Sequence, residues 1–345
     1  MPGTWKGLKV AVKTLLLEDH SSGAQERRRA VKEAAIASAV GRGFPHVLCT
    51  YTHELRPVAQ ASAPSLREAS VWRLYLVQEF CNCGDLHSLL RARVLPGLDA
   101  AFAPSLALAW QLAAGLAHLH SQAVLHRGLS SASVMCALRD PASAQSQSAA
   151  DVGSDAYPPA WRRRIPDAVL GCELVLKLTD FGLSTVLTPD RSRASSFVAQ
   201  GALLYRAPEV ASGQAASASS DVFSLGALVL EVLHARPLQE LLLLPPTTPH
   251  DPAGGSAAGE GDGSSGALGS VTAGASGAAA ASGASQPRSC VLLGPPGAEV
   301  AVRLPASTPG SVCDLLLRCT HVDPSRRPHA RDVLDELSRE LFRLH

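Results

Sequence analysis

The chain has 345 residues, which is long enough to bury the core of one large domain or of two small ones. Its 31 Lys and Arg residues nearly balance its 30 Asp and Glu residues, whereas broad nucleic-acid or membrane-surface binding needs a basic excess. We therefore expect no nucleic-acid partner. Only five of the basic residues are lysines, and Asn82 is the single asparagine. This skew is typical of GC-rich coding, and it makes each remaining lysine worth checking for a functional role.

Short apolar runs and helical spacing predict the first elements. Residues 8–15 are apolar and β-branched and predict a strand, and residues 25–40 have the spacing of a helix. Residues 47–51 and 72–80 predict two further strands, the second with a Leu-Tyr-Leu-Val centre.

The remainder of the chain is mainly helical. Residues 105–121 place leucines at helical intervals and lead into a short strand at residues 122–124. Residues 220–233 predict an apolar helix, and its first turn contains Asp221, where the helix dipole favours a negative charge. Residues 315–344 predict two helices around a proline-rich turn. Strands followed by helices predict an α+β fold with two lobes.

Two low-complexity segments interrupt this order. Residues 140–165 are mainly Ala, Ser, Pro and Arg, and residues 245–287 are Gly, Ala, Ser and Pro almost throughout. Such segments cannot bury enough apolar area to offset the entropy of ordering them, so we expect both to be disordered insertions.

Cysteine usage and hydropathy give expectations about location. The eight cysteines are scattered and form no Cys-x-x-Cys pair, so we expect reduced thiols in a cytoplasmic protein. Residues 1–13 contain no apolar segment, so no signal peptide is expected. The longest uncharged stretch, residues 100–126, contains Pro104 and several polar residues, which favours a buried core helix over a membrane span.

Several short motifs follow one another along the chain. They are Val10-Ala-Val-Lys13, Glu33, Leu74-Tyr-Leu-Val-Gln-Glu-Phe80, His126-Arg-Gly128, Asp180-Phe-Gly182, Ala207-Pro-Glu209, Asp221-Val-Phe-Ser and Asp323-Pro-Ser-Arg-Arg-Pro328. In this order they resemble the eukaryotic protein-kinase family over nearly the whole chain, apart from the two insertions. Residues 201–209 and 319–328 most resemble its tyrosine-kinase-like Ser/Thr branch. The resemblance implies a two-lobed kinase fold, with a partial N-terminal lobe at residues 1–80 and a C-terminal lobe at residues 81–345.

The resemblance implies a site for ATP and Mg²⁺. Lys13 is expected to bind the α and β phosphates and to pair with Glu33, while Asp180 is expected to hold the Mg²⁺ that bridges the phosphates. The alternative for Lys13 is an ordinary surface lysine on a strand, and for residues 180–182 a turn that arises by chance.

The same resemblance places the adenine at the end of the second long strand. Gln78 corresponds to the gatekeeper, and the backbone groups of Glu79 and Cys81 are expected to bind the adenine. Ala11 and Met135 are expected to cover its two faces. These residues are equally compatible with a plain apolar core, because the adenine pocket is itself apolar.

Further roles follow from the resemblance outside the nucleotide site. Glu209 is expected to pair with Arg327, and Asp221 to anchor the backbone of the catalytic loop. The Ser and Thr residues between the Asp-Phe-Gly and Ala-Pro-Glu motifs are candidates for phosphorylation, although such residues are also ordinary in a loop. These candidates are Thr185, Thr188, Ser192, Ser195 and Ser196.

The catalytic loop departs from the family pattern His-Arg-Asp-Leu-Lys-x-x-Asn. His126 and Arg127 are kept, but the aspartate that orients and deprotonates the substrate hydroxyl is replaced by Gly128. The lysine and the asparagine are replaced by Ser130 and Ser133. Loss of a general base lowers a rate by roughly 10²–10⁴-fold. Ordinary phosphotransfer is therefore not expected, and no catalytic residue is assigned.

The N-terminus departs as well. Only residues 1–8 precede Lys9, so the glycine-rich phosphate loop and its hairpin are expected to be missing. The single G-x-G-x-x-G, at residues 261–266, lies in an insertion with no strand before it and is attributed to chance. A truncated gene sequence and a naturally open nucleotide site both remain compatible with this pattern.

Three hypotheses for function follow. The first is a pseudokinase that binds ATP weakly and acts through protein partners in signalling, an active kinase among them. The second is an active Ser/Thr protein kinase that transfers the ATP γ-phosphate to protein Ser or Thr. The third is a decayed gene product with no stable fold. Gly128 favours the first over the second, and the intact late motifs disfavour the third.

Overall fold

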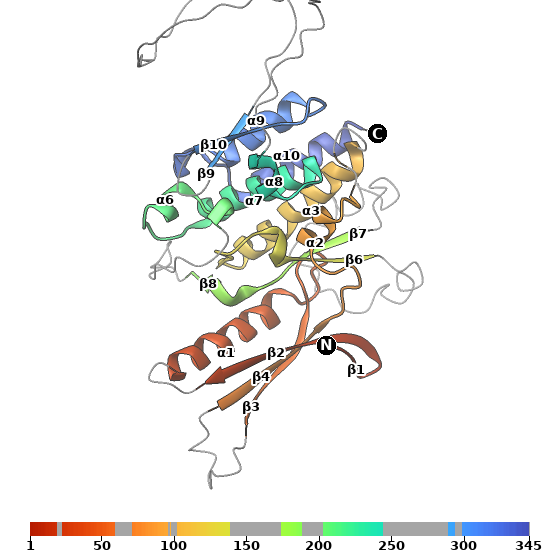
Figure 1. Ribbon diagram of the computed structural model, residues 1–345, viewed down its shortest axis with the longest axis vertical. Coiled ribbons are helices and arrows are strands. Elements are labelled where there is room, and N and C mark those ends of the chain that lie inside the picture. Colours follow the sequence, from red (N-terminus) through yellow and green to blue (C-terminus); the bar gives the residue numbers. More distant parts are fainter. Residues whose placement is uncertain are drawn as a thin grey trace, which may run out of the picture.

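A computed structural model gives the structure of the chain (Figure 1), and it describes residues 1–18, 23–58, 71–95, 97, 102–138, 174–187, 203–243, 289–293 and 299–344. A sheet with one long helix forms the N-terminal part, and helices dominate the rest (Figure 1). The predicted α+β, two-lobed fold is confirmed. Both predicted insertions lie outside the described residues.

The N-terminal sheet is antiparallel, with strand order β1-β2-β4-β3. Its strands are β1 (Pro2–Trp5), β2 (Leu8–Glu18), β3 (Thr50–Pro57) and β4 (Val71–Glu79). Helix α1 (Gly23–Val40) packs on it through Ala30 and Ala34, which share a hydrophobic cluster with Leu17, Leu74 and Leu76 of the strands. This packing places the middle of α1 beside the strand that carries Lys13.

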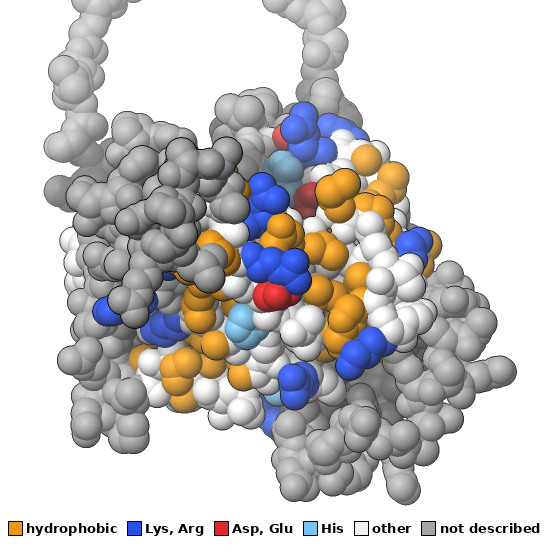
Figure 2. Space-filling model, turned by 90° about the horizontal axis from the view of Figure 1, so that it is seen from below, with side chains coloured by type: hydrophobic (Ala, Val, Ile, Leu, Met, Phe, Trp, Pro, Cys, Tyr) orange, Lys and Arg blue, Asp and Glu red, His pale blue; other side chains and the backbone are white. Residues whose placement is uncertain are grey.

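The view of Figure 2, from below, shows that hydrophobic and basic side chains share the surface on this side of the molecule, with few acidic ones among them. Among the exposed hydrophobic side chains of β2 are Leu8, at 49% exposure, and Leu16, at 55%. Scattered exposed apolar residues of this kind are usual on protein surfaces.

The expectation that no hairpin precedes the strand of Lys13 is wrong. β1 pairs with β2 across the turn Lys6–Gly7. Both turn residues have positive φ, 50° for Lys6 and 80° for Gly7, as the tightest hairpin turns require. This turn is not a glycine-rich loop, but a strand does stand before β2.

The third strand of the sheet also differs from its prediction. Instead of occupying residues 47–51, β3 begins at Thr50, and Val47 makes an isolated bridge to Leu178 of β7 (Leu174–Leu178). Side chains of β3 alternate between more buried and exposed positions, so the strand has no continuous apolar run. The apolar run at residues 47–51 therefore predicted the position of this strand wrongly.

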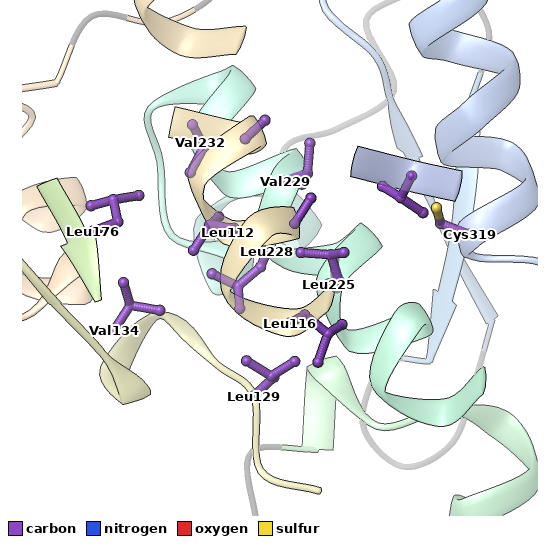
Figure 3. Packing of buried hydrophobic residues seen from close by; sticks show 14 of the residues in the cluster. Leu112, Leu116, Leu129, Val134, Leu176, Leu225, Leu228, Val229, Val232 and Cys319 are labelled. Carbon is purple, nitrogen blue, oxygen red and sulfur yellow. The ribbon is translucent and has the colours of Figure 1, made fainter. Parts of the chain in front are cut away.

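Two predicted helices form the centre of the larger lobe. They are α3 (Phe102–Ser121) and α7 (Ala218–His234), and α10 (Ala330–Phe342) packs along α3. Figure 3 shows Leu112 and Leu116 of α3 beside Leu225 and Leu228 of α7 in the core. All of these side chains are almost fully buried.

Helix α3 is long and apolar enough to cross a membrane, and no other helix in the described ranges passes that test. Every residue from Ser105 to Leu119 is buried against the rest of the fold. The burial agrees with the predicted core helix.

Short elements complete the described fold. β5 pairs with β8, and β6 pairs with β7 across residues 139–173. The hairpin of β9 and β10 was not predicted, and it follows the second insertion. The bounds are α2 (Leu86–Arg91), β5 (Val124–Leu125), β6 (Val134–Leu138), β8 (Thr185–Val186), α6 (Pro208–Ala211), α8 (Leu238–Leu243), β9 (Ser289–Leu293), β10 (Glu299–Arg303) and α9 (Gly310–Cys319). Six cysteines are not in disulfides: Cys49, Cys81, Cys83, Cys136, Cys313 and Cys319.

Candidate functional site

Lys13 lies between two carboxylates that come from different parts of the chain. Its Nζ is 3.5 Å from Oε1 of Glu33 on α1 and 3.6 Å from Oδ1 of Asp180, which follows β7. The side chain of Glu33 is 14% exposed and that of Asp180 is 63% exposed, so solvent screens the second pair more strongly. The fold thus brings three of the predicted residues together.

The environment of Glu33 depends on this contact. Burial raises the pKa of Glu33 above its ordinary value, the positive charge of Lys13 lowers it, and the negative charge of Asp180 raises it again. Lys13 therefore offsets part of the cost of burying this carboxylate, and in return Glu33 holds the ammonium group in the site.

The Asp-Phe-Gly segment packs against α1. Asp180 has a left-handed backbone, with φ of 65°, and Phe181 is 3% exposed with its ring 5.5 Å from that of His126. A Cβ built on Gly182 would lie 3.1 Å from Oε2 of Glu33, so a larger residue there would push the Glu33 carboxylate by a few tenths of an ångström. The segment and α1 therefore fix each other beside Lys13.

Asp221 anchors the catalytic loop, as predicted. Its Oδ2 accepts a hydrogen bond from the backbone N–H of His126 and its Oδ1 one from that of Arg127, each at 2.8 Å. Burial alone would raise the pKa of Asp221, but hydrogen bonds from His120 and the loop backbone outweigh it, so the pKa lies below its ordinary value. The charged carboxylate therefore holds the loop in place.

The residues expected to carry phosphotransfer are absent from this anchored loop. Gly128 packs against Leu183, whose Cδ1 would lie 3.2 Å from a Cβ at Gly128. The hydroxyl of Ser133 donates to the carbonyl oxygen of Ser130 and accepts from its N–H, both at 2.9 Å. The backbone of Ser130 is therefore paired with the side chain of Ser133, and the loop offers no carboxylate at position 128.

The predicted adenine-binding segment is the end of β4. Gln78 is 9% exposed and donates from Nε2 to Oγ1 of Thr50 at 3.0 Å. Ala11 of β2 is its partner in the strand register. The N–H of Glu79 is already bonded within the N-terminal part, to the carbonyl oxygen of Cys49 at 2.9 Å.

Cys81 and Met135 lie on the C-terminal side of this segment. Cys81 is 8% exposed, and burial raises the pKa of its thiol to about 12, which keeps it protonated at neutral pH. Met135 lies on β6, where it bridges to Asp85 and is paired with Lys177 of β7.

Sequence reasoning missed Lys177. Its Nζ is 2.9 Å from Oε1 of Glu79 and donates to the carbonyl oxygen of Pro45 at 2.9 Å, and its side chain is 10% exposed. The pair joins β7 to the end of β4, beside the expected adenine position. The scarcity of lysines in the chain was a signal that could have singled it out.

Sequence reasoning also missed a buried polar cluster around Glu231 on α7. Oε1 of Glu231 accepts hydrogen bonds from the hydroxyl of Tyr205 and the N–H of Leu238, each at 2.7 Å, and Ser131 of the catalytic loop contacts both side chains. Glu231 is fully buried, and burial raises its pKa to about 7 although these hydrogen bonds lower it. An acidic residue inside an otherwise apolar helix was the available signal.

The predicted pair of Glu209 and Arg327 is present. Two nitrogens of the guanidinium donate to the two carboxylate oxygens at 2.7 and 2.8 Å, in a bidentate arrangement. Of the phosphorylation candidates, Thr185 accepts a hydrogen bond from Nζ of Lys32 at 3.5 Å. The candidates Thr188, Ser192, Ser195 and Ser196 lie outside the described residues.

The described part of the chain contains no group of three or more His, Cys, Asp or Glu side chains arranged to hold a metal ion. Mg²⁺ at nucleotide sites is commonly held by one or two carboxylates together with the phosphates and water. The exposed carboxylate of Asp180 fits one such ligand position. It can bind a cation that arrives with a nucleotide.

Known protein kinases match about half of this chain. The serine/threonine-protein kinase PLK4 of Xenopus laevis is 27% identical over 166 residues, which cover 48% of this chain and 13% of the relative. Ribosomal protein S6 kinase alpha-1 of Homo sapiens is 30% identical over 162 residues, 47% of this chain and 16% of the relative. The probable leucine-rich repeat receptor-like protein kinase IMK3 of Arabidopsis thaliana is 28% identical over 169 residues, 48% of this chain and 17% of the relative.

These matches therefore span less than a fifth of each relative's length. A family model described as protein kinase domain matches residues 3–241, well over half of the chain. Proteins of this family generally use ATP and Mg²⁺. Together with the two-lobed fold and the contacts of Lys13, this match shows that the chain belongs to the protein kinase domain family.

Proposed function

We propose that this protein is a pseudokinase: a protein kinase domain that binds ATP weakly, has impaired phosphotransfer, and acts in signalling. The observation that carries the proposal is the contrast between two parts of one site. Lys13 contacts both Glu33 and Asp180, whereas Gly128 leaves the anchored catalytic loop without its carboxylate.

Nucleotide binding is supported by the charges at the site. The ammonium of Lys13 is held by two carboxylates, of which the exposed Asp180 is the more easily displaced by a phosphate. Gln78, Glu79, Cys81, Ala11 and Met135 are proposed to surround the adenine.

Impaired transfer is supported by the chemistry of the loop. A phosphoryl acceptor needs its hydroxyl oriented and deprotonated, and Gly128 has no group that accepts a proton. Ser130 cannot replace the charge of a lysine beside the γ-phosphate. These losses need not multiply, but each acts on the transferring group.

An active Ser/Thr protein kinase is the alternative function. It is favoured by the intact anchoring of the loop, because Asp221 still binds the backbone of His126 and Arg127. The names of the curated relatives agree with this class. The alternative then requires a proton acceptor other than residue 128.

Two measurements on the purified chain separate these functions. We expect ATP to raise the melting temperature of the wild type and not that of Lys13→Ala, because the variant lacks the phosphate-binding ammonium. We expect no transfer of labelled phosphate to a generic protein substrate. Transfer that disappears in Lys13→Ala would establish the active kinase, and an unchanged melting temperature with ATP would refute nucleotide binding.

The proposal extends to the kinase branch and the cellular setting. Residues 201–209 and 319–328 support the tyrosine-kinase-like Ser/Thr branch. Six cysteines are not in disulfides, which suits a cytoplasmic protein. With catalysis impaired, function would depend on protein partners, an active kinase among them, and co-purification from cells with and without Lys13→Ala tests whether they require the nucleotide.

A further inference from the structure

In the catalytic loop, the residue at the family's second metal-binding position is hydrogen-bonded within the loop itself. Kinases hold two Mg²⁺ ions, one through the aspartate of Asp-Phe-Gly and one through the asparagine of the catalytic loop. Here that asparagine position is Ser133, which is 2% exposed. Its hydroxyl donates its only proton to the carbonyl oxygen of Ser130 and accepts from the N–H of the same residue.

A hydroxyl bound in this way is a poor ligand for Mg²⁺. Magnesium prefers carboxylate, carbonyl and water oxygens in a nearly octahedral arrangement. To reach a cation, Ser133 would have to leave both hydrogen bonds at 2.9 Å, which would leave the polar groups of Ser130 unpaired. Gly128, in the same loop, adds no oxygen from a side chain.

Asp180 differs from Ser133 in each of these respects. Its carboxylate is 63% exposed and pairs with Lys13 at 3.6 Å. An exposed pair of this length contributes little, so a divalent cation and a triphosphate can separate it at small cost. Glu33 also pairs with Lys13, at 3.5 Å, and its side chain is far less exposed, at 14%.

We propose that the site binds its nucleotide with a single divalent cation, ligated by Asp180, the phosphates and water, and that the second cation position has been lost with Ser133. This inference rests on the proposed nucleotide binding. It concerns the number of cations and the residue that holds one, and does not depend on whether any phosphotransfer survives.

The test uses the full chain with Mn²⁺ as the probe and a non-hydrolysable ATP analogue. Electron paramagnetic resonance of free Mn²⁺ gives the number of ions taken up per bound nucleotide. We expect one for the wild type and one for Ser133→Ala, because the serine hydroxyl is not a ligand. Two ions in the wild type, or none while the nucleotide is bound, would overturn the proposal.

Asp180→Asn tests the ligand itself. A nucleotide carries a Mn²⁺ ion on its own phosphates, so the readout is the ratio of nucleotide affinities in Mn²⁺ and in EDTA. One charge-assisted contact is expected to make this ratio about tenfold or more in the wild type and close to one in Asp180→Asn. An unchanged ratio in the variant would refute the role of Asp180.

The outcomes also separate this inference from the function on which it rests. Absence of nucleotide binding in both Mn²⁺ and EDTA refutes the proposed function and the inference with it. Binding with two cations refutes the inference alone. A melting curve of each variant in the absence of nucleotide checks that the substitutions leave the fold intact.

Discussion

Gly115 allows helix α3 to lie against the loop that precedes β3. A Cβ at this position would be 2.7 Å from the carbonyl oxygen of His46 and 2.9 Å from Cδ1 of Leu178. We expect Gly115→Ala to lower the free energy of unfolding by about 1–3 kcal/mol, because packed backbone must shift. Chemical denaturation measures the change. Gly310→Ala is the matched control, since nothing lies within 4 Å of the added atom, and equal effects of the two substitutions would contradict the explanation.

Glu231 predicts a pH dependence of stability. Its pKa in the folded chain, about 7, lies above its ordinary value of 4.5, so the folded state favours the protonated carboxyl. The associated stability is fully present below pH 4.5 and is lost as the pH rises through 7. We therefore expect the wild type to lose more stability between pH 5 and pH 8 than Glu231→Gln, which stays neutral. Denaturant titrations of both proteins at the two pH values give this difference, and parallel pH profiles would show that Glu231 does not titrate there.

For single residues, the family motifs predicted side chains that contact one another in the structure. Lys13, Glu33 and Asp180 were predicted because the motif order supplies their roles. Lys177 and Glu231 were not, since side chains that pair with them lie far away in the sequence: Lys177 pairs with Glu79, and Glu231 with Tyr205. A single sequence does not show which distant residues meet in a buried polar contact.

Among the elements, the pair of Glu209 and Arg327 connects α6 to the loop before α10. The side chain of Arg327 is 0% exposed and that of Glu209 is 8% exposed. We expect Arg327→Met alone to lower the free energy of unfolding by about 3–5 kcal/mol, because it leaves a carboxylate buried and unpaired. The double variant Glu209→Gln with Arg327→Met should lose less than the two single variants together. Additive losses in this cycle would mean that the pair has no coupling energy.

Element prediction succeeded where the periodic signal was long. The helices around residues 25–40, 105–121 and 220–233 were found because each has several turns of regular apolar spacing. The pairing of β6 with β7 was not predicted, because two five-residue strands meet across a long intervening segment. β3 was placed too early because its alternating pattern was weaker than the apolar run before it.

In the molecule as a whole, the catalytic loop departs from the family pattern while the two-lobed kinase fold around it is kept. We expect the triple variant Gly128→Asp, Ser130→Lys, Ser133→Asn to raise the rate of phosphate transfer by about 10²-fold or more, since it restores the base and two groups that act on the phosphates. The side chain nearest to a new Cβ at residue 128 is the flexible end of Leu183, which can shift. Transfer of labelled phosphate measures the change, with Ser130→Lys alone as the control. Equal rates in wild type and triple variant would show that the loop is not what limits catalysis.

The two lobes touch on both sides of the nucleotide site. On the side of the adenine-binding segment they are joined by the Lys177–Glu79 pair and by the hydrogen bonds of Leu178 with His46 and Leu48. On the side of α1 they are joined by the pair of Lys13 with Asp180 and by a hydrogen bond from Nε of Arg29 to the carbonyl oxygen of Gly182 at 3.2 Å. The contacts on the side of α1 are the more exposed of the two sets. Because exposed polar contacts contribute less, an opening of the site would separate the contacts on the side of α1 first, and the adenine-binding segment would act as the hinge.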